Sequence, residues 1–296
     1  MSLRPRISVV IPAYNASQWI EAAVRSACNQ TYKPFEVIVS DDGSTDDTCE
    51  VLRRSGLPVT ILTGTNGGPG AARNRGVLNS SGEWLAFLDA DDTWMPQKLE
   101  KQVNLTDDPK VAVINCRHRT KQGVEIGPTI SFQRLWIHND LITSSVLVRR
   151  VAFESVGGFD SNDALRSTED YHLWLRLANA GWRVANCSED LVTYSSPPTS
   201  LSRQAERFAL AEIACLKNVA RCAGMTRTEL SARLVDAYLD HARGAVWNRN
   251  LPLARTLIIR SLGLSLSLRQ IRLLAVATLP RSVLDLRRTL LHRTVG

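Results

Sequence analysis

The sequence contains no uninterrupted apolar run of the roughly 18 residues that a membrane-spanning helix needs. Its six cysteines are scattered, and none forms the Cys-x-x-Cys pair typical of a zinc site or a redox motif. The opening residues are not followed by the apolar core of a secretory leader. We therefore expect a cytoplasmic globular protein with reduced thiols, without a structural zinc ion or a disulfide framework.

Acidic side chains are almost absent from the last part of the chain. Residues 242–296 contain ten arginines against one acid, Asp285. This segment carries a net charge of +9 in a chain whose total is +7, so the remaining residues sum to −2. The basic character therefore belongs to one end of the protein and not to its whole surface.

The first 90 residues contain a regular alternation of short β-branched runs and amphipathic segments. We expect buried strands at residues 7–11, 36–40, 59–62 and 84–88. We expect helices at residues 17–29, 45–54 and 71–78. Ser17 is the expected N-cap of the first helix, and Thr45 or Asp46 that of the second. Such alternation over short connections predicts a parallel sheet covered by helices on both faces.

Polar side chains follow three of these strands, at the point where each strand ends. They are Tyr14 and Asn15 after the first strand, Asp41 and Asp42 after the second, and Asp89, Asp91 and Asp92 after the fourth. Because parallel strands share one direction, these side chains are expected at one edge of the sheet. In open α/β sheets that edge is where ligands bind.

The third of these clusters has the composition of a cation site. Three neighbouring carboxylates repel one another unless a cation lies among them. Hard oxygen ligands suit Mg²⁺ or Mn²⁺, which commonly bind one or two carboxylates together with substrate phosphates. The alternative is an ordinary acidic surface turn, and Pro96 is expected to open a helix directly after it.

A glycine-rich loop, Asn66-Gly67-Gly68-Pro69-Gly70, precedes the third helix. Its backbone can approach a ligand closely, and free N–H groups at the start of a helix attract anions. Arg73 and Arg75 follow in the first turns, either as ligand contacts or as solvated surface arginines.

Four segments, ISVVIPAYN, VIVSDDGSTDDT, GGPGAARNRG and GEWLAFLDADD, resemble in their order and spacing the family 2 glycosyltransferases, which have the GT-A fold. The resemblance covers residues 6–202. It implies an α/β catalytic domain with a Rossmann-like, mostly parallel sheet at 1–202, and a helical, arginine-rich region at 203–296. A capping box at Thr226 and Glu229 is expected to open a helix there that runs to about Asn248. Further helices are expected at residues 253–262, 268–278 and 282–292.

The resemblance also implies a binding site for a nucleotide sugar. The matching positions are Pro12, Ala13, Tyr14, Asn15, Asp41, Asp42, Gly70, Arg73, Asp89 and Ala90. In this assignment Ala13 and Tyr14 flank the base, Asp42 binds its edge, and Arg73 anchors the nucleotide. Asp89 faces the ribose, and Asp91 with Asp89 ligates Mn²⁺ or Mg²⁺. For Asp92 the resemblance leaves a third-ligand role and a structural role open.

A second acidic pair, Glu169-Asp170, opens a helix about eighty residues after the first, with Thr168 as its expected N-cap. Acids at a helix start are often only stabilising, because the helix dipole favours them. In the family one residue of this pair is the catalytic base, and we assign that role to Asp170. Two departures fall nearby: His172 replaces a usual Asp, and Ser195 and Pro197 replace an Arg and a His.

The expected activity is an inverting, metal-dependent transfer of a sugar from a nucleotide-diphosphate donor, UDP- or dTDP-type, to a hydroxyl acceptor. The acceptor class is a glycan or a lipid-linked sugar of a cell-surface polysaccharide. Two alternatives stay open: a nucleotide-sugar-binding assembly partner without transfer activity, and a nucleotidyltransferase. The latter is disfavoured because residues 8–15 contain no Lys or Arg.

The basic helical end has two interpretations. Its helices either lie on the inner face of the cytoplasmic membrane as basic amphipathic segments or pack on protein with solvated arginines. Nucleic acid is a poorer match, because no aromatic residue that stacks on bases follows Trp247.

Overall fold

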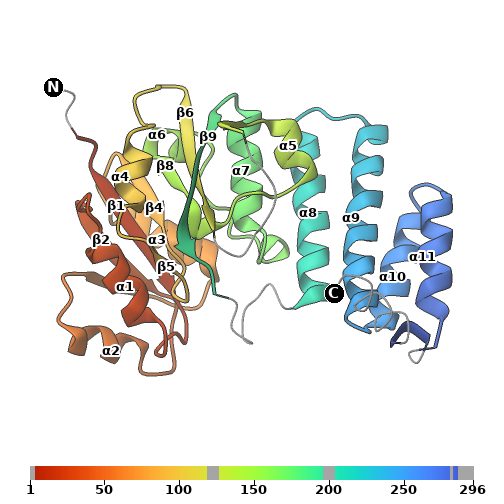
Figure 1. Cartoon of the computed structure of the whole chain (residues 1–296), viewed down its shortest axis with the longest axis horizontal. Coiled ribbons are helices and arrows are strands. Elements are labelled where there is room, and N and C mark those ends of the chain that lie inside the picture. Colours follow the sequence, from red (N-terminus) through yellow and green to blue (C-terminus); the bar gives the residue numbers. More distant parts are fainter. Residues whose placement is uncertain (1–3, 119–126, 196–203, 281–282, 286–296) are drawn as a thin grey trace, which may run out of the picture. The chain divides into compact units, whose positions relative to one another are not determined.

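The computed structural model describes residues 4–118, 127–195, 204–280 and 283–285. The chain divides into two compact units, Met1–Ser200 and Leu201–Gly296. The expected boundary at residue 202 lies outside the described residues. In Figure 1 the first unit runs from red to green and the second is blue.

The first unit begins with four parallel strands in the spatial order β3-β2-β1-β4. They are β1 (Ile7–Ala13), β2 (Glu36–Asp41), β3 (Thr60–Thr63) and β4 (Trp84–Phe87). The helices between them are α1 (Ile20–Cys28), α2 (Thr48–Ser55) and α3 (Pro69–Leu78). The predicted alternation and parallel pairing are therefore confirmed.

Helices α1 and α3 cover opposite faces of this sheet. Val9 and Ile11 of β1 share a core with Ile20 and Val24 of α1. The side chain of Val10 points to the other face, because neighbours on a strand alternate. There a Cβ added to Gly76 of α3 would lie 2.4 Å from Val10 Cγ1. The glycine thus allows α3 to approach the sheet closely.

The sheet continues beyond β4 as β8 (Leu147–Arg149), β6 (Val111–His118), β9 (Arg183–Thr193) and β5 (Thr93–Trp94), with β7 (Thr129–Ile130) also on β9. Strand β8 is antiparallel to both β4 and β6, whereas β6 and β9 are parallel. The remaining helices of the first unit are α4 (Lys98–Val103), α5 (Phe132–Ile137), α6 (Arg150–Ser155) and α7 (Glu169–Asn179), with 3₁₀ turns at Thr143–Ser145 (η1) and Asp163–Leu165 (η2).

Two expected helix starts are wrong in detail. The N-cap of α1 is Trp19 and not Ser17, and that of α2 is Asp47. The Asp46 carboxylate instead accepts hydrogen bonds from Ser17 N at 3.1 Å and Thr48 N at 3.0 Å. Thr168 does occupy the N-cap of α7, but its hydroxyl donates to Leu165 O and caps no helical N–H. Tertiary contacts between loops compete here with local capping.

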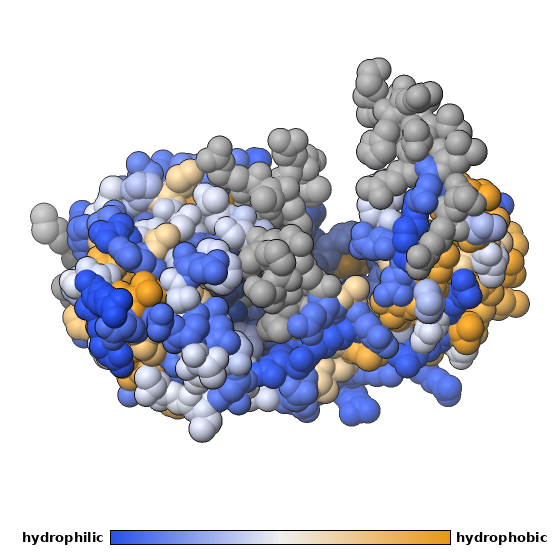
Figure 2. All heavy atoms as spheres, turned by 90° about the horizontal axis from the view of Figure 1, so that it is seen from below, coloured by the Kyte–Doolittle hydropathy of each residue, from blue (hydrophilic) through white to orange (hydrophobic). Residues whose placement is uncertain are grey.

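The second unit contains α8 (Ala205–Cys222), α9 (Arg227–Trp247), α10 (Leu251–Leu262) and α11 (Leu268–Thr278). The capping box of Thr226 and Glu229 at the start of α9 is confirmed. Glu212 of α8 accepts from Arg233 and pairs with His241 of α9, each at 2.8 Å. Among the described helices, none combines the length and apolar character needed to cross a bilayer. Apolar residues on the surface of this unit appear orange at the right of Figure 2.

Candidate active site

The ends of β1, β2 and β4 meet at one edge of the sheet. Ala13 is the register partner of Asp41, and Asp42 N donates to Ala13 O at 2.8 Å. Leu88 N, just after β4, donates to Val10 O at 3.2 Å. The polar side chains that follow these strands are therefore brought together, as the sequence predicts.

The Tyr14-Asn15 segment leaves β1 with its side chains exposed. Tyr14 is 50% exposed, whereas Pro12 and Ala13 are buried. Asn15 has a left-handed φ of 48°, and its Oδ1 accepts from Thr45 N at 2.8 Å. The segment thus offers an exposed aromatic ring beside the sheet edge, held by the loop after β2.

The carboxylates of Asp41 and Asp42 are both buried and organise their own loops. Asp41 Oδ2 accepts from the backbone N–H groups of Gly43 and Ser44 at 3.2 and 3.1 Å. The Asp42 carboxylate accepts from Gly67 N at 3.0 Å and from Gly68 N at 2.7 Å. Asp42 therefore shapes the glycine loop with the same carboxylate oxygens that were expected to bind the edge of the nucleotide base.

The glycine loop requires its glycines for conformation and for packing. Gly68 has φ +88°, a region that L-residues rarely adopt. Gly70 lies buried in the first turn of α3, where an added Cβ would stand 3.2 Å from Glu169 Cγ. Gly70 therefore permits the contact between α3 and the second acidic motif.

Asp92 is the structural member of the acidic turn after β4. It is 1% exposed, and its two oxygens accept from Ser144 Oγ at 2.6 Å and Ser195 N at 2.7 Å. Burial, and then the nearby charge of Asp89, raises the pKa of Asp92 to about 8. A carboxyl that is largely protonated at neutral pH and engaged on both oxygens links the turn to two other segments. It is a poor candidate for a cation ligand.

Asp91 differs from Asp92 in the hydrogen bonds that its carboxylate receives. Within the described part of the chain no other residue donates a hydrogen bond to its carboxylate. Burial, followed by the charge of Asp89, raises its pKa to about 6. A cation near this pair would relieve that electrostatic cost.

The residues present fit a hard divalent ion. In the described part of the chain no three His, Cys, Asp or Glu side chains are grouped to hold a metal alone. Asp89 and Asp91 supply two carboxylates, and Mg²⁺-type ions often complete such a set with substrate phosphates and water. The donor set therefore suits an ion that arrives with a phosphorylated ligand.

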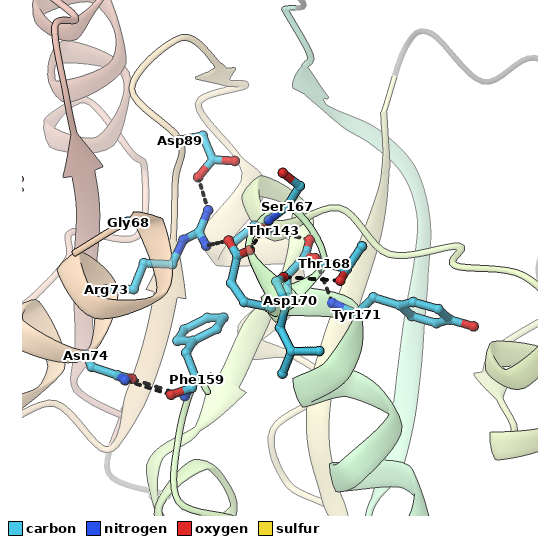
Figure 3. Close-up of polar contacts among 12 residues, drawn as sticks. Gly68, Arg73, Asn74, Asp89, Thr143, Phe159, Ser167, Thr168, Asp170 and Tyr171 are labelled. Carbon is cyan, nitrogen blue, oxygen red and sulfur yellow. Dashed lines mark hydrogen bonds and ion pairs between the residues drawn. The ribbon is translucent and has the colours of Figure 1, made fainter. Parts of the chain in front are cut away.

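Arg73 of α3 joins the two acidic motifs (Figure 3). Its Nη2 donates to Asp89 Oδ1 and its Nη1 to Glu169 Oε1, both at 2.7 Å. The guanidinium is 4% exposed and lies 5.3 Å from the centre of the Phe159 ring. The two carboxylates raise its pKa further above the ordinary value, so it stays charged. Arg73 is thus engaged within the protein and is not a solvated arginine.

The two carboxylates at the start of α7 have different hydrogen-bond partners. Glu169 is buried between Arg73 Nη1 and Ser167 N, which donates to Oε2 at 2.8 Å. Asp170 Oδ2 accepts from Thr143 Oγ1 at 2.8 Å, and Oδ1 from Tyr171 N at 2.6 Å (Figure 3). Burial, and then the charge of Glu169, raises the pKa of Asp170 to about 6. A carboxylate with that pKa is suited to accept a proton near neutral pH.

The backbone is strained where this motif begins. Ser167 has φ 91°, an uncommon value for a residue with a Cβ. Strain of this kind costs of order 1–3 kcal/mol and concentrates at functional sites. The strained conformation directs Ser167 N toward the Glu169 carboxylate.

The turn η1, Thr143-Ser144-Ser145, belongs to the site and was missed in the sequence. Thr143 binds Asp170, while Ser144 donates to Asp92 and accepts from Asp89 N at 3.0 Å. All three residues are buried. Three consecutive hydroxyl residues before a buried strand were the available signal, because buried hydroxyls need partners.

The two departures near the end of the first unit have different outcomes. His172 is buried in α7. Ser195 contacts Asp92 through its backbone N–H, so this contact does not depend on the side chain at position 195. Pro197 lies outside the described residues.

Comparisons with known proteins agree on one family. Residues 8–158 match the family described as "Glycosyl transferase family 2", and residues 130–285 match "Glycosyl transferase family group 2". An uncharacterized glycosyltransferase of Rickettsia prowazekii is 32% identical over 188 residues, which span 58% of each chain. An Escherichia coli protein, UDP-Glc:alpha-D-GlcNAc-diphosphoundecaprenol beta-1,3-glucosyltransferase, is 30% identical over 61% of this chain and 73% of its own.

Solved structures are similar over most of the chain. A mannosyltransferase from Pyrobaculum calidifontis, in complex with GDP-Man and Mn²⁺, matches with a TM-score of 0.67 at 22% identity, covering 93% of this chain and 79% of its own. This likeness confirms the expected fold, an α/β GT-A domain followed by a helical region.

Proposed function

The chain belongs to glycosyl transferase family 2, and from this premise we propose that it transfers a sugar from a nucleotide-diphosphate sugar to a hydroxyl acceptor, with inversion at the anomeric carbon. One observation carries the proposal. Arg73 holds Asp89, from the acidic turn, and Glu169, from the start of α7, on the same guanidinium. Asp170, the carboxylate suited to accept a proton, follows Glu169 directly, so Arg73 connects it with the carboxylates suited to a cation.

Asp170 is the proposed general base. It accepts the proton of the acceptor hydroxyl as the oxygen forms its bond to the anomeric carbon and the diphosphate leaves. Help of this kind is typically worth about 10²–10⁴-fold in rate. Thr143 orients the carboxylate through its hydroxyl, leaving the ionised form hydrogen-bonded. Because the displacement is single, no covalent sugar–enzyme intermediate is required.

Glu169 and Arg73 are proposed to position the base. Glu169 is engaged by Arg73 and by Ser167 N, and these contacts hold the first turn of α7. Its charge contributes to the raised pKa of Asp170. Arg73, assigned to nucleotide anchoring from the sequence, is proposed to reach the donor through Asp89.

Asp91, with the free oxygen of Asp89, is proposed to hold Mn²⁺ or Mg²⁺. When bound there, such an ion supplies Lewis-acid neutralisation of the charge on the diphosphate leaving group. The support is the donor set of two carboxylates and the Mn²⁺ in the Pyrobaculum structure. Tyr14, exposed at the end of β1, is proposed to lie against the base together with Ala13.

The proposed donor carries uridine or thymidine, and the proposed acceptor is a glycan or a lipid-linked sugar for the cell surface. The Escherichia coli relative is named for a UDP-glucose donor and a diphosphoundecaprenol acceptor, whereas the Pyrobaculum structure holds GDP-Man. A thermal-shift screen of sugar nucleotides with Mn²⁺ tests the donor directly. A ligand at 100 times its Kd adds about 2.7 kcal/mol to the free energy of unfolding.

Product analysis tests the reaction class. Incubation with the donor that gives the largest shift, Mn²⁺ and acceptor should release free nucleoside diphosphate, and Asp170→Asn should not release it. Pyrophosphate as the product would identify a nucleotidyltransferase. Donor binding without any product over a panel of glycan and lipid-linked acceptors would favour the assembly-partner alternative.

A further inference from the structure

In and beside the turn between α10 and α11, polar residues are buried and apolar residues are exposed. Gln270 of α11 and Ser261 of α10 are fully buried. In contrast, Leu266 and Leu268 are 76% and 70% exposed, and Ile259 is 60% exposed. An isolated exposed leucine needs no explanation, but a group of them beside buried polar residues does.

A hydrogen-bond network fixes this arrangement. Gln270 Nε2 donates to Ser261 Oγ at 3.1 Å and to Ser265 O at 2.9 Å, and Gln270 Oε1 accepts from Ser267 Oγ at 2.9 Å. Satisfied buried amides of this kind rigidify their surroundings. The leucines therefore face outward because the turn is held in that shape.

We define the apolar tip as Ile259, Leu264, Leu266, Leu268 and Ile271, all of which are exposed. Exposed arginines accompany it: Arg260, Arg269 and Arg272. Arg269 approaches Asp236 at 3.5 Å, with both side chains more than half exposed. The only acid in residues 242–296 is Asp285, so the segment that forms the tip is strongly basic, although Asp236 of α9 lies beside Arg269.

We propose that the apolar tip and its arginines bind the surface of an anionic lipid bilayer. The leucines enter the boundary between headgroups and acyl chains, and the arginines contact lipid phosphates. The described helices are too short or too polar to cross the bilayer, which fits attachment from one side. This inference is independent of the proposed reaction, because it rests on the second unit alone.

Charge distinguishes this partner from two others. A symmetric contact between two copies of the chain would gather the arginines of both copies in one interface, and like charges repel. A nucleic acid would satisfy the arginines but not the leucines, and no aromatic residue after Trp247 is available for base stacking. A bilayer with anionic headgroups matches both components.

The test is co-sedimentation of the full chain with vesicles of equal parts phosphatidylcholine and phosphatidylglycerol, compared with phosphatidylcholine alone, at low salt. We expect pelleting with the anionic vesicles only. Arg260→Gln with Arg272→Gln should weaken that binding by about tenfold or more, since each basic residue near such a surface contributes. Leu266→Ser with Leu268→Ser should reduce it by a similar factor. The matched controls are Leu78→Ser, at an 84%-exposed leucine, and Arg25→Gln with Arg54→Gln, at exposed arginines of the first unit.

Controls should pellet like the unaltered protein, and all variants should keep its circular dichroism spectrum and donor-induced thermal shift. Failure of the unaltered protein to pellet with anionic vesicles would overturn the inference. Equal binding of the tip variants would overturn it too, because another surface would then be responsible. Light scattering decides the remaining case: a mass that falls from dimer to monomer with Leu266→Ser and Leu268→Ser, without vesicle binding, would identify a self-interface instead.

Discussion

Arg73 and Glu169 lie 96 residues apart in the chain, and their side chains form a 2.7 Å ion pair in which both are almost fully buried. The same guanidinium binds Asp89 at 2.7 Å. The pair therefore ties α3, the end of β4 and the start of α7 into one unit. Its removal should affect both stability and the geometry of the proposed base.

Replacing the Arg73 guanidinium should lower the free energy of unfolding. Arg73→Met leaves Asp89 and Glu169 without their shared partner, and breaking a buried pair typically costs about 3–5 kcal/mol. Glu169→Gln combined with Arg73→Met should cost less than the sum of the single changes, with a coupling of about 0.5–3 kcal/mol. Urea unfolding of the four proteins measures this coupling.

The matched control is Arg54, whose exposed pair with Glu50 has a similar separation of 2.8 Å. Arg54→Met should change the free energy of unfolding by less than about 1 kcal/mol, because exposed pairs contribute little. Additive effects of Arg73→Met and Glu169→Gln would show that the two side chains are not energetically coupled.

The carboxylates of the acidic turn should separate into two functions. Asp91→Ala is expected to abolish Mn²⁺-dependent binding of the donor while leaving the melting temperature nearly unchanged. Asp92→Ala is expected to do the reverse, because Ser144 and Ser195 N lose a buried partner at a cost of about 1–3 kcal/mol. Calorimetric titration of the donor with and without Mn²⁺, together with thermal melts, distinguishes them. Unchanged Mn²⁺-dependent binding in the Asp91 variant would refute its role as a ligand.

The rate should depend on the ionisation of Asp170. Its pKa of about 6 lies above the ordinary value, so the carboxylate is available as a base above that pH. We expect kcat/KM to fall about tenfold per pH unit below pH 6. The Thr143 hydroxyl lowers the pKa of Asp170, so Thr143→Val should move the acidic limb of the profile to higher pH. If the acidic limb does not move, the titration that limits the rate does not belong to Asp170.

Substitution of each acid tests the assignment within the pair. Asp170→Asn should lower kcat and spare donor affinity, and it should also flatten the pH dependence of stability. The native state holds this proton more tightly than the unfolded chain, so the site contributes stability at low pH that is lost as pH rises through about 6. Were Glu169→Gln inactive and Asp170→Asn active, the roles would be exchanged.

The close approach of α3 to the sheet should depend on Gly76. Gly76→Ala brings a methyl group within 2.4 Å of Val10 Cγ1 and should cost about 1–3 kcal/mol by overpacking. Adding Val10→Ala should recover part of that loss, because it removes the opposing atom. Gly244→Ala, in an open position of α9, is the control and should stabilise the protein by about 0.5–1 kcal/mol. Thermal melts of Gly76→Ala, Val10→Ala, the double variant and Gly244→Ala suffice, and full additivity at 76 and 10 would contradict the contact.

Much of the fold was predictable because it follows from short-range patterns. The strand runs ending at Ala13 and Asp41 are continuous and β-branched, so their burial and direction could be inferred from the sequence. The capping box at Thr226 was predictable because both of its partners lie within one helical turn. The N-cap of α1 at Trp19 was not predictable, because Ser17 is engaged by Asp46 from a different loop.

The sequence by itself determined the class of the fold, the family resemblance and the convergence of acidic residues on one sheet edge, since strand direction places strand ends. Only the tertiary structure decided how those acids differ. Asp92 is hydrogen-bonded to Ser144 and Ser195, Glu169 is paired with Arg73, and Asp170 is hydrogen-bonded to Thr143. Each difference arises from a contact between segments far apart in the chain, and local pattern carries no information about such contacts. For the same reason the outward leucines of the α10–α11 turn became evident only once Gln270 was placed inside it.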